Sequence, residues 1–365
     1  MSSEVIQQGG KLLGQGVYGC AFDPPLKCVT RKTGIVKTKA GRKVGKITKH
    51  TDAQTEFGIS QTLQNIPNAD KYFTLIEEIC TPLSRTKQTE PDLKKCEPIK
   101  GQPLPSMLQV IMPFAGKPLR LVPHRTKTIQ YFKFGQHILE AGALLLVGGV
   151  VHGDLHSMNI MVDSPTTAKF IDFGLAWRPE ALTLANLPKL YRTFNPSINQ
   201  EPPELSMING YLAQLDEQLI FDRIQEEKRT VLLLSKIYGT SQKQQIQSLK
   251  RFVKGSWSFQ HRNWFSFYSL YWSKIDAWAL GNALLTLFVD LVMDPLFEKT
   301  DEFKAKGESS LITIKGLCQM DPSKRLDAAE ALVLWAPDSK VLQEPGVVKW
   351  LEEKRRIRLE LEKLI

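Results

Sequence analysis

Residues 152–159 are His-Gly-Asp-Leu-His-Ser-Met-Asn, and residues 171–174 are Ile-Asp-Phe-Gly. The first stretch contains Asp154 shortly before Asn159, and the second adds Asp172. A carboxylate can orient or deprotonate a hydroxyl group, while an amide oxygen and a second carboxylate are oxygen ligands of the kind that Mg²⁺ prefers. This order of groups is rare, so the two stretches predict the chemistry of the chain.

The three groups match the requirements of metal-assisted phosphoryl transfer. Asp154 is the candidate catalytic base, and Asn159 and Asp172 are the candidate ligands of Mg²⁺ on the phosphates of ATP. We therefore expect ATP and Mg²⁺ as substrate and cofactor.

A glycine-rich stretch near the amino terminus fits the same chemistry. Residues 13–21 are Leu-Gly-Gln-Gly-Val-Tyr-Gly-Cys-Ala. Glycines allow the backbone to lie close over phosphate groups, but a dinucleotide-binding turn has the same letters. Pro24 and Pro25 follow soon after, where such a turn would need a helix. A strand–turn–strand loop is therefore favoured, with these residues over the phosphates: Gly14, Gly16, Val17 and Gly19.

Lys46 and Glu56 are the best-placed lysine and glutamate between the glycine-rich stretch and the residues that follow it, with Lys43 and Lys49 as alternatives to Lys46. Residues 43–48 alternate as a strand does, and Lys46 lies between the apolar Val44 and Ile47. Residues 52–66 have the apolar spacing of a helix that carries Glu56.

Two further strands are expected at residues 72–79 and 108–113. Residues 80–105 are polar and rich in proline and lysine, which predicts a loop insertion outside the core. Met112 precedes a hinge-like Pro-Phe-Ala-Gly and is a candidate for the adenine pocket, with plain core packing as the alternative.

These motifs resemble those of eukaryotic-type protein kinases over roughly residues 10–340. Gly-Gln-Gly-Val-Tyr-Gly-Cys at 14–20 and Asp-Pro-Pro-Leu-Lys-Cys at 23–28 resemble serine/threonine kinases of large double-stranded DNA viruses. Three later motifs also match, namely Pro202-Pro203-Glu204, Asp276-Ala277-Trp278-Ala279-Leu280-Gly281 and Asp321-Pro322-Ser323-Lys324-Arg325.

The resemblance implies an α+β fold of two lobes, one with a small antiparallel sheet and one helix, the other mainly helical. It implies that Lys46 and Glu56 form an ion pair that positions the phosphates, and that Arg325 pairs with Glu204. The expected parts are an N-terminal tail (1–9), a small lobe (10–113, insertion 80–105), a large lobe (114–345, helical insertion at about 205–260) and an amphipathic helix (346–365).

Two residues depart from the family pattern. Gly153 replaces an arginine that couples the catalytic loop to a phosphate on the activation segment, which predicts activity without strict dependence on that phosphorylation. His156 stands where such kinases usually have lysine, and it is a candidate to stabilise the transferring phosphoryl group.

Three functions are compatible with these motifs. The favoured one is transfer of the γ-phosphoryl group of ATP to serine or threonine in proteins. The phrase at 152–156 also occurs in aminoglycoside-type phosphotransferases, which generally lack the Glu204 and Arg325 motifs. A kinase-like binding scaffold is the third, and a partner at residues 205–260 is an alternative to ordinary core packing there.

Net charge, cysteine count and apolar stretches bear on the partners and the location of the chain. The net charge is +10, yet a solvated basic hairpin accounts for part of it, so nucleic acid is not expected as a partner. Five scattered cysteines without a close pair argue against disulfides and zinc, which predicts reduced thiols and a cytoplasmic location, in a host cell or virion if viral. The apolar stretches 141–151 and 277–293 are expected as buried core elements, and no membrane is expected.

Overall fold

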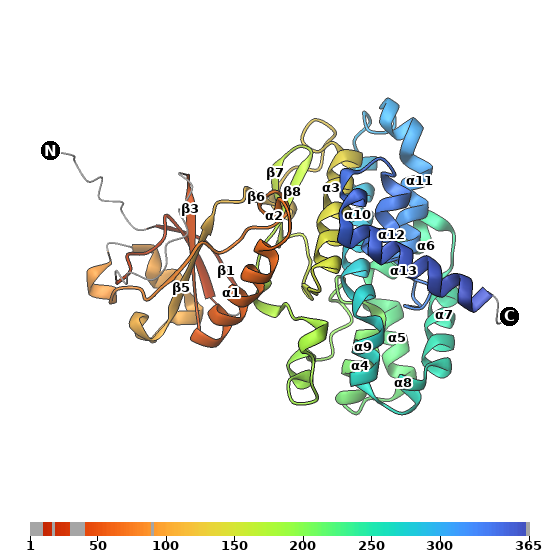
Figure 1. The fold of residues 1–365 in the computed structure, drawn as a ribbon, viewed down its shortest axis with the longest axis horizontal. Coiled ribbons are helices and arrows are strands. Elements are labelled where there is room, and N and C mark those ends of the chain that lie inside the picture. The colour runs from red at the N-terminus through yellow and green to blue at the C-terminus, as the bar shows by residue number, and fades with distance from the viewer. Residues whose placement is uncertain (1–9, 17–18, 30–40, 89–90, 363–365) are drawn as a thin grey trace. The chain divides into compact units, whose positions relative to one another are not determined.

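The computed structural model describes residues 10–16, 19–29, 41–88 and 91–362 (Figure 1). The chain forms two compact units. The first comprises Met1–Gly116 with Ile171–Gly174, and the second comprises Lys117–Phe170 with Leu175–Ile365. One antiparallel sheet dominates the first unit, and helices dominate the second. The α+β class expected from the sequence is therefore confirmed.

The first unit is built on a five-stranded antiparallel sheet with the strand order β1-β2-β3-β5-β4. Its strands are β1 (Lys11–Gly16), β2 (Gly19–Asp23), β3 (Lys43–Thr48), β4 (Glu78–Cys80) and β5 (Leu108–Pro113). Its helices are α1 (His50–Gln64) and the short α2 (Ala69–Tyr72). The strand expected at 72–79 is wrong over most of its length, because Tyr72 belongs to α2 and β4 begins only at Glu78.

The glycine-rich stretch forms the two edge-side strands of this sheet. β1 pairs with β2 antiparallel, with Gly16 opposite Gly19, so the two strands of the prediction are confirmed. A Cβ atom on Gly19 would lie 1.9 Å from the Ile47 carbonyl oxygen, so only glycine allows β2 to approach β3 here. Val17, also a predicted phosphate-loop residue, lies outside the described residues.

The sequence predicted that residues 80–105 form a loop outside the core, and this prediction is wrong. Several of their apolar side chains are buried against β2 and β3 in one hydrophobic cluster. The members from the insertion are Leu93, Cys96, Ile99 and Leu104, and those from the sheet include Cys20, Phe22 and Ile47. The proline- and lysine-rich composition concealed these few anchors, which are spaced too irregularly to give a strand or helix pattern.

Disulfides tie the insertion to the sheet, which corrects the prediction of reduced thiols. Cys20 on β2 is bonded to Cys96 in the insertion, and Cys28 is bonded to Cys80 at the end of β4. The Cα–Cα distances are 6.1 Å and 5.9 Å. Only Cys318 is a free cysteine among the described residues, and it is buried. Sequence spacing did not indicate the pairs because topology, not proximity in the chain, brings them together.

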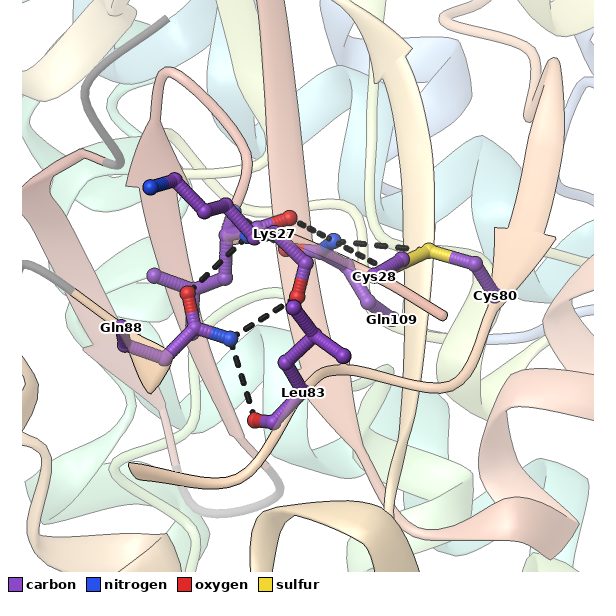
Figure 2. The surroundings of a disulfide bond; sticks show 7 residues. Lys27, Cys28, Cys80, Leu83, Gln88 and Gln109 are labelled. Atoms are coloured by element: carbon purple, nitrogen blue, oxygen red, sulfur yellow. Dashed lines mark hydrogen bonds between the residues drawn. A yellow bond between two sulfur atoms is a disulfide. The ribbon is translucent and has the colours of Figure 1, made fainter. Parts of the chain in front are cut away.

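Two glutamine side chains fix the segment that carries Cys28 (Figure 2). The amide of Gln88 accepts from the Lys27 N–H at 3.0 Å and donates to the Lys27 carbonyl at 2.8 Å. Gln109, fully buried on β5, donates to the Leu26 carbonyl at 2.9 Å and accepts from its N–H at 2.8 Å. The two amides thus add to the backbone pairing of this segment, in which Val29 donates to the Thr81 carbonyl and Leu83 donates to the Lys27 carbonyl, each at 2.8 Å.

The second unit is mostly helical (Figure 1). It has one small antiparallel sheet of β6 (Lys117–Pro118), β7 (Ile160–Ser164) and β8 (Thr167–Phe170). Its helices are α3 (Tyr131–Val147), α4 (Pro203–Leu212), α5 (Glu217–Glu227), α6 (Arg229–Tyr238), α7 (Gln242–Gly255), α8 (Trp257–Gln260), α9 (Trp264–Tyr271), α10 (Ile275–Val292), α11 (Asp301–Leu317), α12 (Ala328–Trp335) and α13 (Pro345–Glu362).

The core of the second unit surrounds α3 and α10. Both helices are buried along most of their length, and α12 packs against α3. The stretch Trp264–Val292 is long and apolar enough to cross a bilayer, but 67% of its most apolar window is buried inside the unit. Burial in a protein core explains the same composition.

The region 205–260 and the tail both pack on this core. Helices α4 to α8 occupy the region 205–260, and Phe259 is buried while Trp257 is half exposed. In α13, Val347 is fully buried and the Trp350 indole N–H donates to Asp327 at 3.0 Å. The tail helix is therefore docked on the unit rather than solvated all round.

The Cys20–Cys96 disulfide should stabilise the first unit. Replacing both residues by serine frees a loop that spans 76 residues, so we expect the free energy of unfolding to fall by about 2–4 kcal/mol. Chemical denaturation of the wild type and of Cys20→Ser/Cys96→Ser measures this loss. In reductant the two proteins should unfold at similar denaturant concentrations. Five alkylatable thiols in the unreduced, denatured wild type would contradict the assignment.

Candidate functional site

Lys46 lies between two carboxylates in the first unit. Its Nζ is 2.9 Å from Glu56 Oε2 and 2.7 Å from Asp172 Oδ1. Lys46 comes from the middle of β3, Glu56 from α1, and Asp172 from the short stretch that joins this unit much later in the chain. The predicted Lys46–Glu56 ion pair is confirmed, and Asp172 is a second partner of the lysine.

The environment keeps Lys46 charged. Burial by itself would lower its pKa, but the charges of Glu56 and Asp172 outweigh burial and raise the pKa above its usual value. Glu56 is buried, whereas the side chain of Asp172 is 45% exposed. The arrangement holds a permanent positive charge next to an accessible carboxylate, which suits phosphate and metal binding respectively.

The backbone around Asp172 is special. Its φ is +64°, in the left-handed region that costs non-glycine residues energy and that occurs most often at functional sites. The Phe173 ring packs edge-on against Phe73, with 6.1 Å between the ring centroids. This packing anchors the neighbouring residue and so helps to keep the Asp172 carboxylate on Lys46.

The other candidate residues belong to the second unit, on the loop 152–159. Asp276, in the first turn of α10, accepts hydrogen bonds from the backbone N–H groups of His152 at 2.6 Å and Gly153 at 2.9 Å. Burial raises the pKa of Asp276, although both backbone N–H groups and His152 favour its charged form. A half-buried carboxylate that accepts two backbone hydrogen bonds thus fixes the start of the loop.

Gly153 has a conformation that explains why arginine is absent there. Its φ is +73°, and a Cβ atom would lie 3.2 Å from the Leu175 carbonyl oxygen. A larger residue would be strained by both the backbone angle and the contact. This loop geometry therefore selects glycine and leaves the position without a cation.

Two residues that the sequence analysis missed contact the candidate base. Arg192 places Nη1 3.4 Å from Asp154 Oδ1 and donates from Nη2 to the Gly153 carbonyl at 2.7 Å. Gln200 donates from Nε2 to the same Asp154 oxygen at 3.1 Å. Both lie far along the chain in irregular structure, and no motif marks them. Arg192 supplies a positive charge to a loop whose own sequence has none at Gly153.

His156 and Asn159 lie on the same loop as Asp154. His156 accepts the Met158 N–H at Nδ1 (3.1 Å), so its Nε2 is the protonated nitrogen of the neutral ring, 3.6 Å from Asp154 Oδ2. Asn159 donates from Nδ2 to the Asp154 carbonyl at 3.0 Å. This bond assigns the amide nitrogen of Asn159 and leaves its oxygen as the atom suited to a metal.

The region 205–260 holds the segment that carries Arg192 and Gln200. Asn209 on α4 accepts the Arg192 N–H at 3.1 Å. Lys228, between α5 and α6, donates to the carbonyls of Ile198 and Glu201, each at 2.9 Å. The helical insertion therefore positions the groups that contact Asp154.

Lys228 is an unusual element of this support. Its side chain is almost wholly buried, and this burial lowers its pKa to about 8 despite the opposing charges of Glu201 and Glu204. Burial also raises the pKa of Glu201. A cation is costly to bury unless its hydrogen bonds are satisfied, and two carbonyls of the segment 198–201 satisfy this one.

A buried ion pair fixes the end of the same segment. Arg325 donates from Nη1 and Nη2 to the two oxygens of Glu204 at 2.7 Å and 2.8 Å. Both side chains have 0% exposure. Arg325 also donates to the carbonyls of Gln319 and Lys274. The predicted pair is confirmed, and it ties the first turn of α4 to the loop before α12.

The remaining candidates are less specific. Gly14 and Gly16 lie on β1, and no atom of the described residues lies within 4 Å of where their Cβ atoms would be. Met112 packs in a hydrophobic cluster with Val44 and Ile76, which is the core-packing alternative. In the described part of the chain, no three His, Cys, Asp or Glu side chains gather as a metal cluster.

Neither a known protein-family model nor a curated protein matches this chain.

Removing one partner of the Glu204–Arg325 pair should lower the free energy of unfolding of the second unit. Glu204→Leu leaves a buried arginine uncompensated, and we expect the free energy of unfolding to fall by about 3–5 kcal/mol. Glu204→Leu/Arg325→Met removes both charges and should recover part of the loss. Chemical denaturation measures both variants.

The exposed Asp301–Lys304 pair offers the matched control. Asp301→Asn should change the free energy of unfolding by no more than about 1 kcal/mol. An equally small effect of Glu204→Leu would contradict the role assigned to the buried pair.

Proposed function

We propose that the chain is an ATP-dependent protein kinase that phosphorylates serine or threonine, and that its two units are the lobes of a protein-kinase-like fold. The observation that carries the proposal is Lys46, held at 2.9 Å by Glu56 and at 2.7 Å by Asp172. A lysine on a strand, a glutamate on the next helix and a distant aspartate are the groups that bind nucleotide phosphates in protein kinases.

Asp154 is the proposed base. Its carboxylate would accept the proton of the attacking hydroxyl group, and Arg192 and Gln200 hold that carboxylate through Oδ1. His156, with Nε2 on the side of Asp154 Oδ2, is the proposed partner of the transferring phosphoryl group. Lys46 would bind and orient the phosphates before transfer.

Each unit offers an oxygen donor of the kind that Mg²⁺ prefers. In the first unit Asp172 offers a half-exposed carboxylate. In the second unit the Asn159 amide keeps its oxygen as the donor atom, because its nitrogen is bonded to the Asp154 carbonyl. Mg²⁺ prefers such oxygen ligands, with one or two protein groups and the remainder from phosphates and water. When bound, the ion would neutralise charge on the nucleotide phosphates.

Protein substrates are favoured over small molecules by the Glu204–Arg325 pair and by α4 to α8, which fasten the segment 192–201 near Asp154. Aminoglycoside-type phosphotransferases generally lack that pair. Serine and threonine specificity rests on the resemblance to viral kinases alone. A cytoplasmic location was expected from reduced thiols, and the disulfides Cys20–Cys96 and Cys28–Cys80 remove that support.

Transfer from γ-labelled ATP tests the proposal. Wild-type protein with Mg²⁺ should label serine or threonine in a protein panel and leave an aminoglycoside panel unlabelled. Asp154→Asn should lower the rate by about 100-fold or more, because it removes the general base. Asp163→Asn, the same change at an exposed position on β7, should leave the rate unchanged.

Each other outcome identifies a different function. Label on aminoglycosides alone would replace the protein kinase by a small-molecule phosphotransferase. Binding of ATP without label on any acceptor would favour a kinase-like scaffold. Equal rates for Asp154→Asn and wild type would remove Asp154 from the chemistry.

We expect Arg192 to supply the positive charge beside Asp154 without phosphorylation of the segment that carries it. Arg192 gives the catalytic loop a fixed cation. We therefore expect a quadruple variant to keep appreciable activity when Thr183, Thr193 and Ser197 are replaced by alanine and Tyr191 by phenylalanine. Arg192→Gln should lower kcat by about 10–100-fold, which corresponds to the loss of a charged hydrogen bond. Steady-state kinetics of both variants checks this.

Arg178→Gln is the control, since Arg178 lies in the same segment and pairs with Glu180 rather than with Asp154. It should retain wild-type kcat. Complete inactivity of a folded quadruple variant, or wild-type kcat in Arg192→Gln, would contradict the substitution of Arg192 for a phosphate-linked arginine.

A further inference from the structure

Helix α13 packs on the short 3₁₀ helix Trp272–Lys274, which leads directly into α10. The Trp350 ring of α13 meets the Trp272 ring edge to face, with 5.5 Å between the ring centroids. Asp276 follows at once in the first turn of α10, where its carboxylate fixes the start of the loop 152–159. The tail helix therefore contacts the stretch of chain that carries the support of the catalytic loop.

A second connection between α13 and this stretch runs through Asp327, whose side chain is fully buried. The Trp350 indole donates to Asp327 Oδ2 at 3.0 Å, and Lys354 Nζ lies 3.6 Å from the same oxygen. Lys274 Nζ lies 3.7 Å from that oxygen as well. A buried carboxylate is costly unless cations and N–H groups satisfy it. Helix α13 and the residue that precedes α10 are thus bound to one buried charge.

Lys274 connects this carboxylate with both supports of the candidate base. It lies two residues before Asp276, the acceptor for the backbone of the catalytic loop. Its own carbonyl accepts a hydrogen bond from Arg325 at 3.0 Å, and Arg325 is paired with Glu204 at the end of the segment 192–204. A shift of Lys274 would therefore reach the loop from both directions.

We propose that Trp350 and Lys354 are positioning residues for the candidate base, and that docked α13 holds the Asp276 carboxylate where it fixes the catalytic loop. Detachment of α13 loosens this loop. The effect on the loop follows from these contacts alone, while an effect on the reaction rate rests on the proposed kinase function. That effect falls on kcat, because Lys46, the proposed phosphate-binding residue, belongs to the first unit.

Hydrogen exchange measures the coupling without any reaction. Trp350→Ala/Lys354→Ala should raise the exchange rate of the His152 and Gly153 amides by about tenfold, the size expected when a hydrogen bond to a charged group is lost. The amides of β7 and β8, in the same unit, should keep their wild-type rates. Mass spectrometry of short peptides separates the two regions.

Two further variants separate positioning from general destabilisation. Trp350→Phe keeps a ring against Trp272, so its loop amides should exchange more slowly than those of Trp350→Ala. The matched control Trp257→Ala/Lys349→Ala makes the same two replacements at exposed positions of the second unit and should exchange like the wild type. Circular dichroism at the temperature of the measurement shows that each variant is folded.

Unchanged exchange of both loop amides in Trp350→Ala/Lys354→Ala would overturn the proposal. An equal rise in every part of the second unit would also overturn it, because α13 would then stabilise the unit as a whole and not the loop. Neither result depends on phosphoryl transfer.

The γ-labelled ATP assay then tests the effect on the reaction. The kcat of Trp350→Ala/Lys354→Ala should fall by about tenfold with the KM for ATP unchanged, as expected when a reacting group is displaced slightly. Wild-type kcat together with faster loop exchange would contradict the positioning role. A wild type that transfers no label would refute the proposed kinase and leave the exchange result standing, so the two failures are distinguishable.

Discussion

The bidentate ion pair between Glu204 and Arg325 is the interaction on which the second unit depends. Both side chains are fully buried, so neither charge has water as an alternative partner. Arg325 also donates to two backbone carbonyls, and its guanidinium lies 5.2 Å from the Trp278 ring. Every neighbouring element must therefore keep its place for the pair to remain satisfied. The segment that precedes Glu204 inherits this fixed end.

From that fixed end, a chain of hydrogen bonds runs to Asp154. Lys228 holds the carbonyls of Ile198 and Glu201, and the Trp278 indole donates to the Asn199 carbonyl at 2.9 Å. The backbone of 198–201 is thereby set, and Gln200 reaches the Asp154 carboxylate. The helical insertion thus has a structural role at the site, because its buried Lys228 holds the backbone from which Gln200 contacts the candidate base. A cation buried at this cost is best explained by such a positioning role.

Much of this arrangement could be predicted from local sequence, and the failures share one cause. β5, α1 and the pairs Lys46–Glu56 and Glu204–Arg325 follow from residue pattern and from motifs whose partners are known by type. The disulfides, the buried anchors of residues 80–105, and the contacts of Arg192 and Gln200 depend on residues that meet only after folding. Cys20 and Cys96, for example, are 76 residues apart, and no periodicity links them. A sequence pattern predicts the secondary structure of a segment, but it does not predict which distant irregular segment will pack against it.

The positive φ at position 153 favours glycine, and the positive charge next to Asp154 comes from Arg192 instead. The loop needs a positive φ at position 153 and leaves 3.2 Å to the Leu175 carbonyl, so an arginine there would strain the backbone that Asp276 fixes. A carboxylate on an otherwise uncompensated loop still benefits from a nearby cation. Arg192 satisfies this need from the following segment, through Asp154 Oδ1 and the Gly153 carbonyl. Because the Arg192 N–H donates to the Asn209 side chain, the packing of α4 positions the backbone that carries this cation.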